Sequence, residues 1–96
     1  VHVRGNIMPA RDTHQRALIL RLRRVEGQIR GIQAMMENGD SCDRIAQQLS
    51  AARKALDKTF HEMVACHLQM EIADNPDSDH VLAATEHMTR LLSKYG

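Results

Sequence analysis

The sequence predicts a single all-α domain of three helices, and three observations support this fold class. Apolar residues recur with helical spacing in three segments, at about residues 12–38, 41–73 and 78–94, and none alternates with a period of two. Two clusters of turn-forming residues separate these segments. Aromatic residues make up only 2% of the chain, which argues against an aromatic-rich β-sandwich. A length of 96 residues allows one domain at most.

The first two segments predict an antiparallel helical hairpin. In both, apolar residues follow one another at alternating steps of four and three positions, which is the pattern of a heptad seam. Asn38 and Gly39 favour a tight turn between the two helices. The seam residues are Leu18, Leu22, Val25, Ile29, Ile32 and Met36, followed by Ile45, Leu49, Ala52, Leu56, Thr59, Met63, Cys66 and Met70.

The third segment follows a break at residues 74–78 and predicts a shorter helix. Two long helices and a short one cannot surround a core. The second helix also carries a second apolar line at Phe60, Val64 and His67, which indicates more than one neighbour. We therefore expect further burial between chains, in a dimer or a dimer of dimers.

The net charge of +1 conceals an uneven distribution of charge. Residues 11–31 hold six Arg against Asp12 and Glu26, whereas residues 71–96 hold five acids against Arg90 and Lys94. A basic helix face of this kind is either simply solvated or binds the phosphates of duplex DNA in a salt-dependent way. The near absence of aromatic residues argues against binding by base stacking.

Other classes of function receive little support. The sequence shows no nucleophile, base and orienting group in a catalytic pattern and no phosphate-binding loop, so we do not expect an enzyme. Apolar runs are too short to span a membrane. Cys42 and Cys66 do not form a disulfide framework, which favours reduced thiols in the cytoplasm.

Four residues are candidates for effector chemistry. His67 and Glu71 are four positions apart, so they project from one helix face and either ligate a metal or form an ordinary solvated pair. Cys42 lies at a helix start, where the helix dipole favours a reactive or metal-binding thiolate, although it also fits as a small residue without a role. Cys66 falls on the seam and fits best as a buried side chain.

Four short sequence blocks, taken together, resemble the CsoR/RcnR/FrmR family of bacterial transcriptional repressors, and the resemblance extends over about residues 9–95. The matching blocks are Arg24-Val25-Glu26-Gly27-Gln28-Ile29-Arg30-Gly31-Ile32, Cys42, Ala51-Ala52-Arg53-Lys54-Ala55-Leu56-Asp57 and His67-Leu68.

The resemblance implies a disc-like homotetramer built from antiparallel helical dimers. It implies that Cys42 of one chain meets His67 of another at an effector site, and that effector binding releases operator DNA. It also places DNA contacts on basic residues of the first two helices. The candidates for DNA binding are Arg16, Arg21, Arg23, Arg24, Arg53 and Lys94.

The position four residues after His67 indicates the branch of the family. By resemblance, the copper sensors of the family have Cys at this position and the nickel or cobalt sensors have His, whereas this chain has Glu71. That pattern is similar to the formaldehyde-responsive FrmR branch, in which the chain starts Met-Pro. Met8-Pro9 resembles such a start, so we expect residues 1–8 to be a non-native or disordered leader and residues 9–96 the domain.

The resemblance leaves two effectors open. Formaldehyde can join the Pro9 amine to the Cys42 thiolate through a methylene bridge, provided that Pro9 is N-terminal. No cofactor is then required. Alternatively Cys42, His67 and Glu71 bind Zn(II), Co(II) or Ni(II), with His61 or Cys66 as further donors, because thiolate, imidazole and carboxylate suit these ions better than Cu(I).

Overall fold

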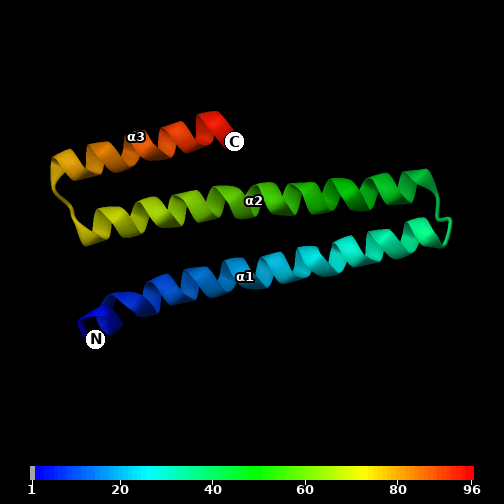
Figure 1. Ribbon diagram of the computed structural model, residues 1–96, viewed down its shortest axis with the longest axis horizontal. Coiled ribbons are helices and arrows are strands. Elements are labelled where there is room, and N and C mark those ends of the chain that lie inside the picture. Colours follow the sequence, from blue (N-terminus) through cyan, green and yellow to red (C-terminus); the bar gives the residue numbers. More distant parts are fainter. Residues whose placement is uncertain (1) are drawn as a thin grey trace.

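The computed structural model describes the backbone of residues 2–96 and the side chains from residue 13 onward. Three helices follow one another: α1 (His2–Glu37), α2 (Cys42–Asp74) and α3 (Ser78–Tyr95). They lie side by side in one flat layer with α2 in the middle, within an envelope of 56 × 33 × 12 Å (Figure 1). The all-α prediction is confirmed. Its boundaries agree closely, except that α1 extends toward the N-terminus beyond the expected start near residue 12.

The turn between α1 and α2 forms as the Asn38-Gly39 signal predicts. Gly39 adopts a φ of +70°, the left-handed conformation that ends a helix. Its N–H donates to the carbonyl of Met36 at 3.2 Å, and the N–H of Asp40 donates to the carbonyl of Met35 at 2.9 Å. These two bonds satisfy carbonyl groups at the helix end that would otherwise lack partners.

We expect Gly39→Ala to destabilise the protein by about 1–2 kcal/mol, because a Cβ is unfavourable in the left-handed conformation. No heavy atom lies within 4 Å of a Cβ built there, so the cost comes from the backbone alone. Gly31→Ala is the matched control: its Cβ also meets nothing within 4 Å, but Gly31 lies inside α1, so stability should rise by about 1 kcal/mol. Urea unfolding at a fixed chain concentration measures both changes, and equal effects would contradict this explanation.

Side-chain caps begin the other two helices. The Ser41 hydroxyl accepts a hydrogen bond from the N–H of Arg44 at 3.2 Å, and Asp40 pairs with the Arg44 guanidinium. Asp77 caps α3 by accepting from the N–H of Asp79 at 3.2 Å. Both caps lie in the breaks that the sequence predicts, and together they fix where α2 turns back on α1 and α3 turns back on α2.

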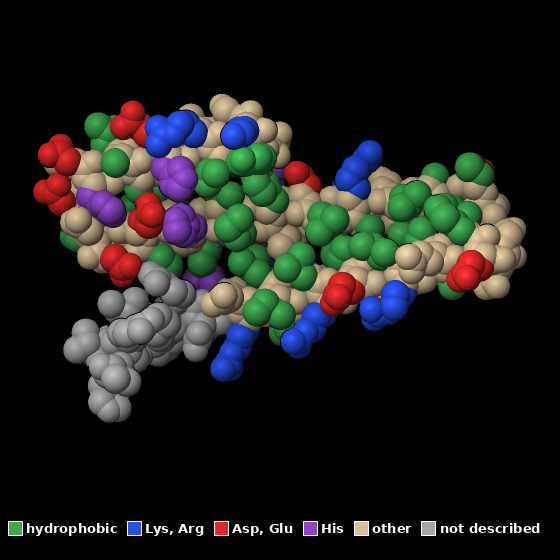
Figure 2. All heavy atoms as spheres, viewed as in Figure 1, with side chains coloured by type: hydrophobic (Ala, Val, Ile, Leu, Met, Phe, Trp, Pro, Cys, Tyr) green, Lys and Arg blue, Asp and Glu red, His purple; other side chains and the backbone are tan. Residues whose placement is uncertain are grey.

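The seam is only half closed within one chain. Val25 and Ile32 of α1 and Ala52 and Thr59 of α2 are buried, as the heptad pattern predicts. Other seam residues remain 43–54% exposed and form an apolar row along the hairpin (Figure 2). The exposed seam residues are Leu22, Ile29, Met36, Leu49, Leu56 and Met63.

The second apolar line of α2 has its neighbour in the same chain. Val64 is 3% exposed, and Ala84 of α3 is 5% exposed. Both line a narrow gap between α2 and α3 together with Leu68, Met88 and Leu91. This line therefore does not by itself require another chain. The exposed apolar row along the hairpin still leads us to expect burial against a second chain. Over the part of the chain that the structure describes, none of the helices contains an apolar stretch of the length that a membrane span requires.

Candidate metal centre and nucleic-acid interface

His67 and Glu71 form a pair on the surface of α2. Their spacing of four residues aligns them along one face, and Nε2 of His67 lies 3.0 Å from Oε1 of Glu71. The side chains are 55% and 32% exposed, so both are accessible to a ligand. The sequence predicted this pairing. His61, by contrast, donates from Nδ1 to the carbonyl oxygen of Asp57 at 2.8 Å and is not part of the cluster.

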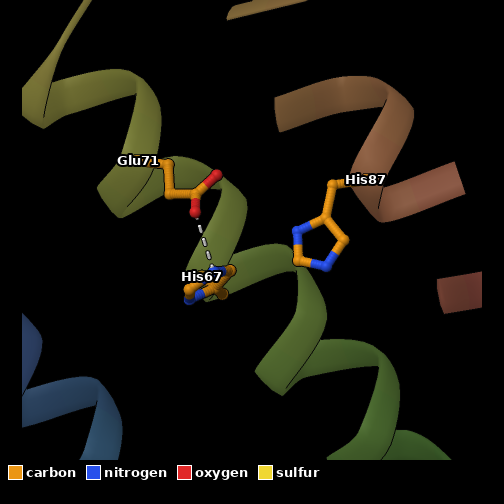
Figure 3. A group of neighbouring side chains, drawn as sticks. All are labelled: His67, Glu71 and His87. Carbon is orange, nitrogen blue, oxygen red and sulfur yellow. Dashed lines mark ion pairs between the residues drawn. The ribbon is translucent and has the colours of Figure 1, made fainter. Parts of the chain in front are cut away.

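His87 of α3 joins this pair, although the sequence did not indicate it as a candidate. Its ring meets the ring of His67 edge to face, with centroids 6.3 Å apart and planes at 83°. One ligand atom from each of His67, Glu71 and His87 lies within 4.8 Å of the others (Figure 3). Helical spacing could have indicated this position, because His87 lies three residues after Ala84 and four before Leu91, on the face of α3 that packs against α2.

The cluster lies over packed side chains and beside an open groove. Val64 and Ala84 are buried beneath it, between α2 and α3. On the other side, His67 and Glu71 border a largely apolar groove of about 270 Å³ between α1 and α2. Cys66 is half-buried there, close to the expectation for a seam residue. The remaining residues of the groove are Gln15, Leu18, Met63 and Met70.

Cys42 lies at the other end of α2. It is the first residue of the helix and is exposed, as expected. Twenty-five residues separate it from His67, a distance of about 37 Å along the helix axis. One chain therefore does not bring Cys42 to His67 and Glu71, and a site that contains all three needs a second chain. Pro9 and residues 1–8 lie outside the residues whose side chains are described.

Basic side chains project in a row along α1 (Figure 2). Arg16 and Arg23 are exposed and seven residues apart, which is two helical turns, so they share a face. With Ile19 and Leu20 they line a shallow groove on this helix. The spacing of positive charges along one face suits contacts to successive phosphates of a nucleic acid backbone.

Arg21 is already engaged. It forms an ion pair with Glu62 of α2, and its side chain is 34% exposed. The hydrogen bond from Arg21 is the largest influence on Glu62 and lowers the pKa of that carboxyl below its usual value of 4.5. The pair therefore holds at neutral pH and is lost as the pH falls through the lowered pKa of Glu62. Arg21 is thus a predicted DNA contact whose guanidinium is already paired with the Glu62 carboxylate.

The remaining predicted DNA contacts are spread over the three helices. Arg24 and Arg53 are exposed on α1 and α2. Lys94 lies near the end of α3, with its ammonium 5.3 Å from the centre of the Tyr95 ring. Because α2 separates α3 from α1, Lys94 is not continuous with the α1 arginines within one chain (Figure 1).

Comparison with known proteins agrees with these features. A family described as "Metal-sensitive transcriptional repressor" matches residues 14–94. The copper-sensing transcriptional repressor CsoR of Bacillus subtilis (strain 168) is 41% identical over 54 residues, which cover 56% of this chain and 54% of that protein. An uncharacterized protein in the bioA 5′ region of Serratia marcescens is 29% identical over 59 residues, covering 62% of this chain and 65% of that protein.

The aligned region thus spans between about half and two thirds of each of these relatives. No solved structure matches the chain. The family match covers most of the sequence, including the α1 arginines from Arg16 onward, Cys42 and the His67–Glu71–His87 cluster. The members are repressors rather than enzymes, and their partner is DNA. The chain belongs to the family of metal-sensitive transcriptional repressors.

Proposed function

We propose that this repressor holds double-stranded operator DNA through the exposed arginines of α1 and releases it when an effector reacts or binds. The row of basic side chains on α1 carries this proposal, because exposed guanidinium groups two turns apart match phosphate contacts (Figure 2). Arg24, Arg53 and Lys94 remain predicted DNA contacts, and Lys94 needs the assembly of chains to join the surface of the α1 arginines. The open apolar row on the hairpin supports association between chains, and the family resemblance implies that the DNA-binding unit is a homotetramer.

Substitutions that separate free from restrained arginines test the DNA surface. Arg23→Ala should weaken operator binding and reduce the slope of log K against log salt by about 1, as expected for one lost phosphate contact. Arg21→Ala should have a smaller effect, because Glu62 already neutralises Arg21. Glu62→Gln should strengthen binding by freeing Arg21. Fluorescence anisotropy over a range of salt concentrations measures all three, and unchanged binding in Arg23→Ala would contradict the assigned surface.

For the effector, the first candidate is formaldehyde. The presence of Glu71 four residues after His67, where related copper sensors carry a thiol, supports this choice. The Cys42 thiol of one chain and the Pro9 amine of another each add to the same formaldehyde carbon, an N–CH2–S bridge forms between the chains, and one water molecule leaves. Cys42 is exposed at the start of α2 and therefore accessible to the aldehyde. Detoxification genes are the corresponding targets.

Operator binding during a formaldehyde titration tests this candidate, with two forms of the protein. A chain that begins at Pro9 has a free secondary amine, whereas in a chain that begins at Val1 the Pro9 nitrogen is acylated and not nucleophilic. Only the chain that begins at Pro9 should release DNA at low formaldehyde concentrations. Equal release from both forms would contradict the bridge.

A divalent metal ion is the second candidate effector, and the His67–Glu71 geometry favours it. Imidazole and carboxylate donors 3.0 Å apart suit Zn(II), Co(II) or Ni(II). Cys42 of a second chain would complete the set that the family resemblance implies. The bound ion would hold these donors together, and with them the helices that carry them.

A further inference from the structure

We propose that His87 is a metal ligand, and that with His67 and Glu71 it forms a divalent-metal site that joins α2 to α3 within one chain. The inference extends the second candidate effector and rests on it. His87 contributes a third donor from a different helix (Figure 3). The expected set of Cys42, His67 and Glu71 lacks this residue, and spacing along α2 does not reveal it.

The separations of the donor atoms are close to those of a coordinated ion. Two ligands at about 2.1 Å from a tetrahedral ion lie about 3.4 Å from each other. The 3.0 Å contact between His67 Nε2 and Glu71 Oε1 already approaches this separation. The third donor lies within 4.8 Å of the others, so His87 needs to approach by at most about 1.4 Å. Because His87 is exposed, rotation of its side chain can supply this movement without disturbing the core.

The chemistry of the donor set defines the ion. Two neutral imidazoles and one carboxylate suit Zn(II), Co(II) or Ni(II), whereas Cu(I) prefers sulfur donors. Three protein ligands leave a position for water or for a thiolate from a second chain. The packed residues beneath the cluster, Val64 and Ala84, hold the two helices at a fixed spacing. The structure thus positions the backbones of all three ligands before an ion binds.

Cobalt titration of the full-length chain tests the role of His87. We expect Co(II) to develop the visible absorption of a low-symmetry site, and His87→Ala to weaken binding by about tenfold or more. His87→Gln keeps a side chain of similar size without the imidazole and should lose affinity in the same way. His80→Ala removes another histidine from α3 and should bind as the unaltered chain does. Far-ultraviolet circular dichroism checks that each variant remains helical.

Cys42→Ser separates failure of this inference from failure of the metal-effector proposal. A tenfold loss of affinity in both His87 variants together with a change in the visible cobalt absorption supports ligation by His87. A tenfold loss of affinity with an unchanged cobalt spectrum would overturn ligation, because losing a residue that merely orients a ligand costs as much affinity. Unchanged affinity and spectrum in both His87 variants, with a loss in Cys42→Ser, would overturn the role of His87 but leave metal sensing intact. No cobalt binding by the unaltered chain would overturn both proposals.

Discussion

Cys42→Ser is expected to abolish the release of operator DNA by formaldehyde in a chain that begins at Pro9. A Ser hydroxyl at the start of α2 is a far weaker nucleophile than a thiolate, so the methylene bridge cannot close. Well-oriented pairs of reacting groups reach effective concentrations of about 10⁵ M or more, and any such advantage is lost when either nucleophile is removed. Anisotropy of labelled operator DNA during formaldehyde titration measures the effect.

Cys66→Ser is the matched control, because it removes the chain's other thiol from the half-buried groove between α1 and α2. Its DNA release should follow that of the unaltered chain. DNA binding without formaldehyde should also be unchanged in both variants, because both cysteines lie on α2, away from the arginines of α1 that are proposed to contact DNA. A formaldehyde response that persists in Cys42→Ser would remove the thiol from the mechanism.

Glu71→His is expected to raise the affinity for Co(II) and Ni(II) by about tenfold or more, equivalent to about 1.4 kcal/mol. The substitution replaces a carboxylate with an imidazole, a donor these ions bind strongly. The new ring would lie one helical turn from His67 and near His87, so its nitrogen would join the imidazole donors of the cluster. Competition with a chelator of known affinity measures the gain.

Glu26→His makes the same exchange of side chains at an exposed position of α1, away from the cluster. It controls for the loss of a negative charge and for adventitious binding by an added histidine. Its metal affinity should equal that of the unaltered chain. A gain in Glu26→His as large as that in Glu71→His would show that Glu71 has no special place in metal binding.

Local signals in the sequence were sufficient to predict the helices and their turns. Gly39 and Asn38 favour a helix end regardless of what packs around them, and Ser41 and Asp77 are efficient caps. Partners between helices were harder to assign. The apolar line through Val64 indicated a second neighbour, but only the return of α3 along α2 shows that Ala84 supplies it.

The same limit applies to the candidate site. His67 and Glu71 are four residues apart, so helix geometry alone predicts their contact. His87 is twenty residues from His67, and its approach depends on how α3 docks on α2. The pairing of Arg21 with Glu62 also depends on docking, in this case of α1 on α2, so the sequence predicts Arg21 as a DNA contact without revealing its carboxylate partner.

The proposed effector is tested most directly by the intact mass of the chain that begins at Pro9. The mass is measured before and after a low dose of formaldehyde, and operator binding is followed in parallel. One methylene bridge adds a carbon atom, about 12 Da, and we expect this gain to accompany DNA release, with peptide mapping placing it between Pro9 and Cys42. DNA that stays bound to a chain of unchanged mass would contradict the formaldehyde mechanism and favour the metal ion as effector.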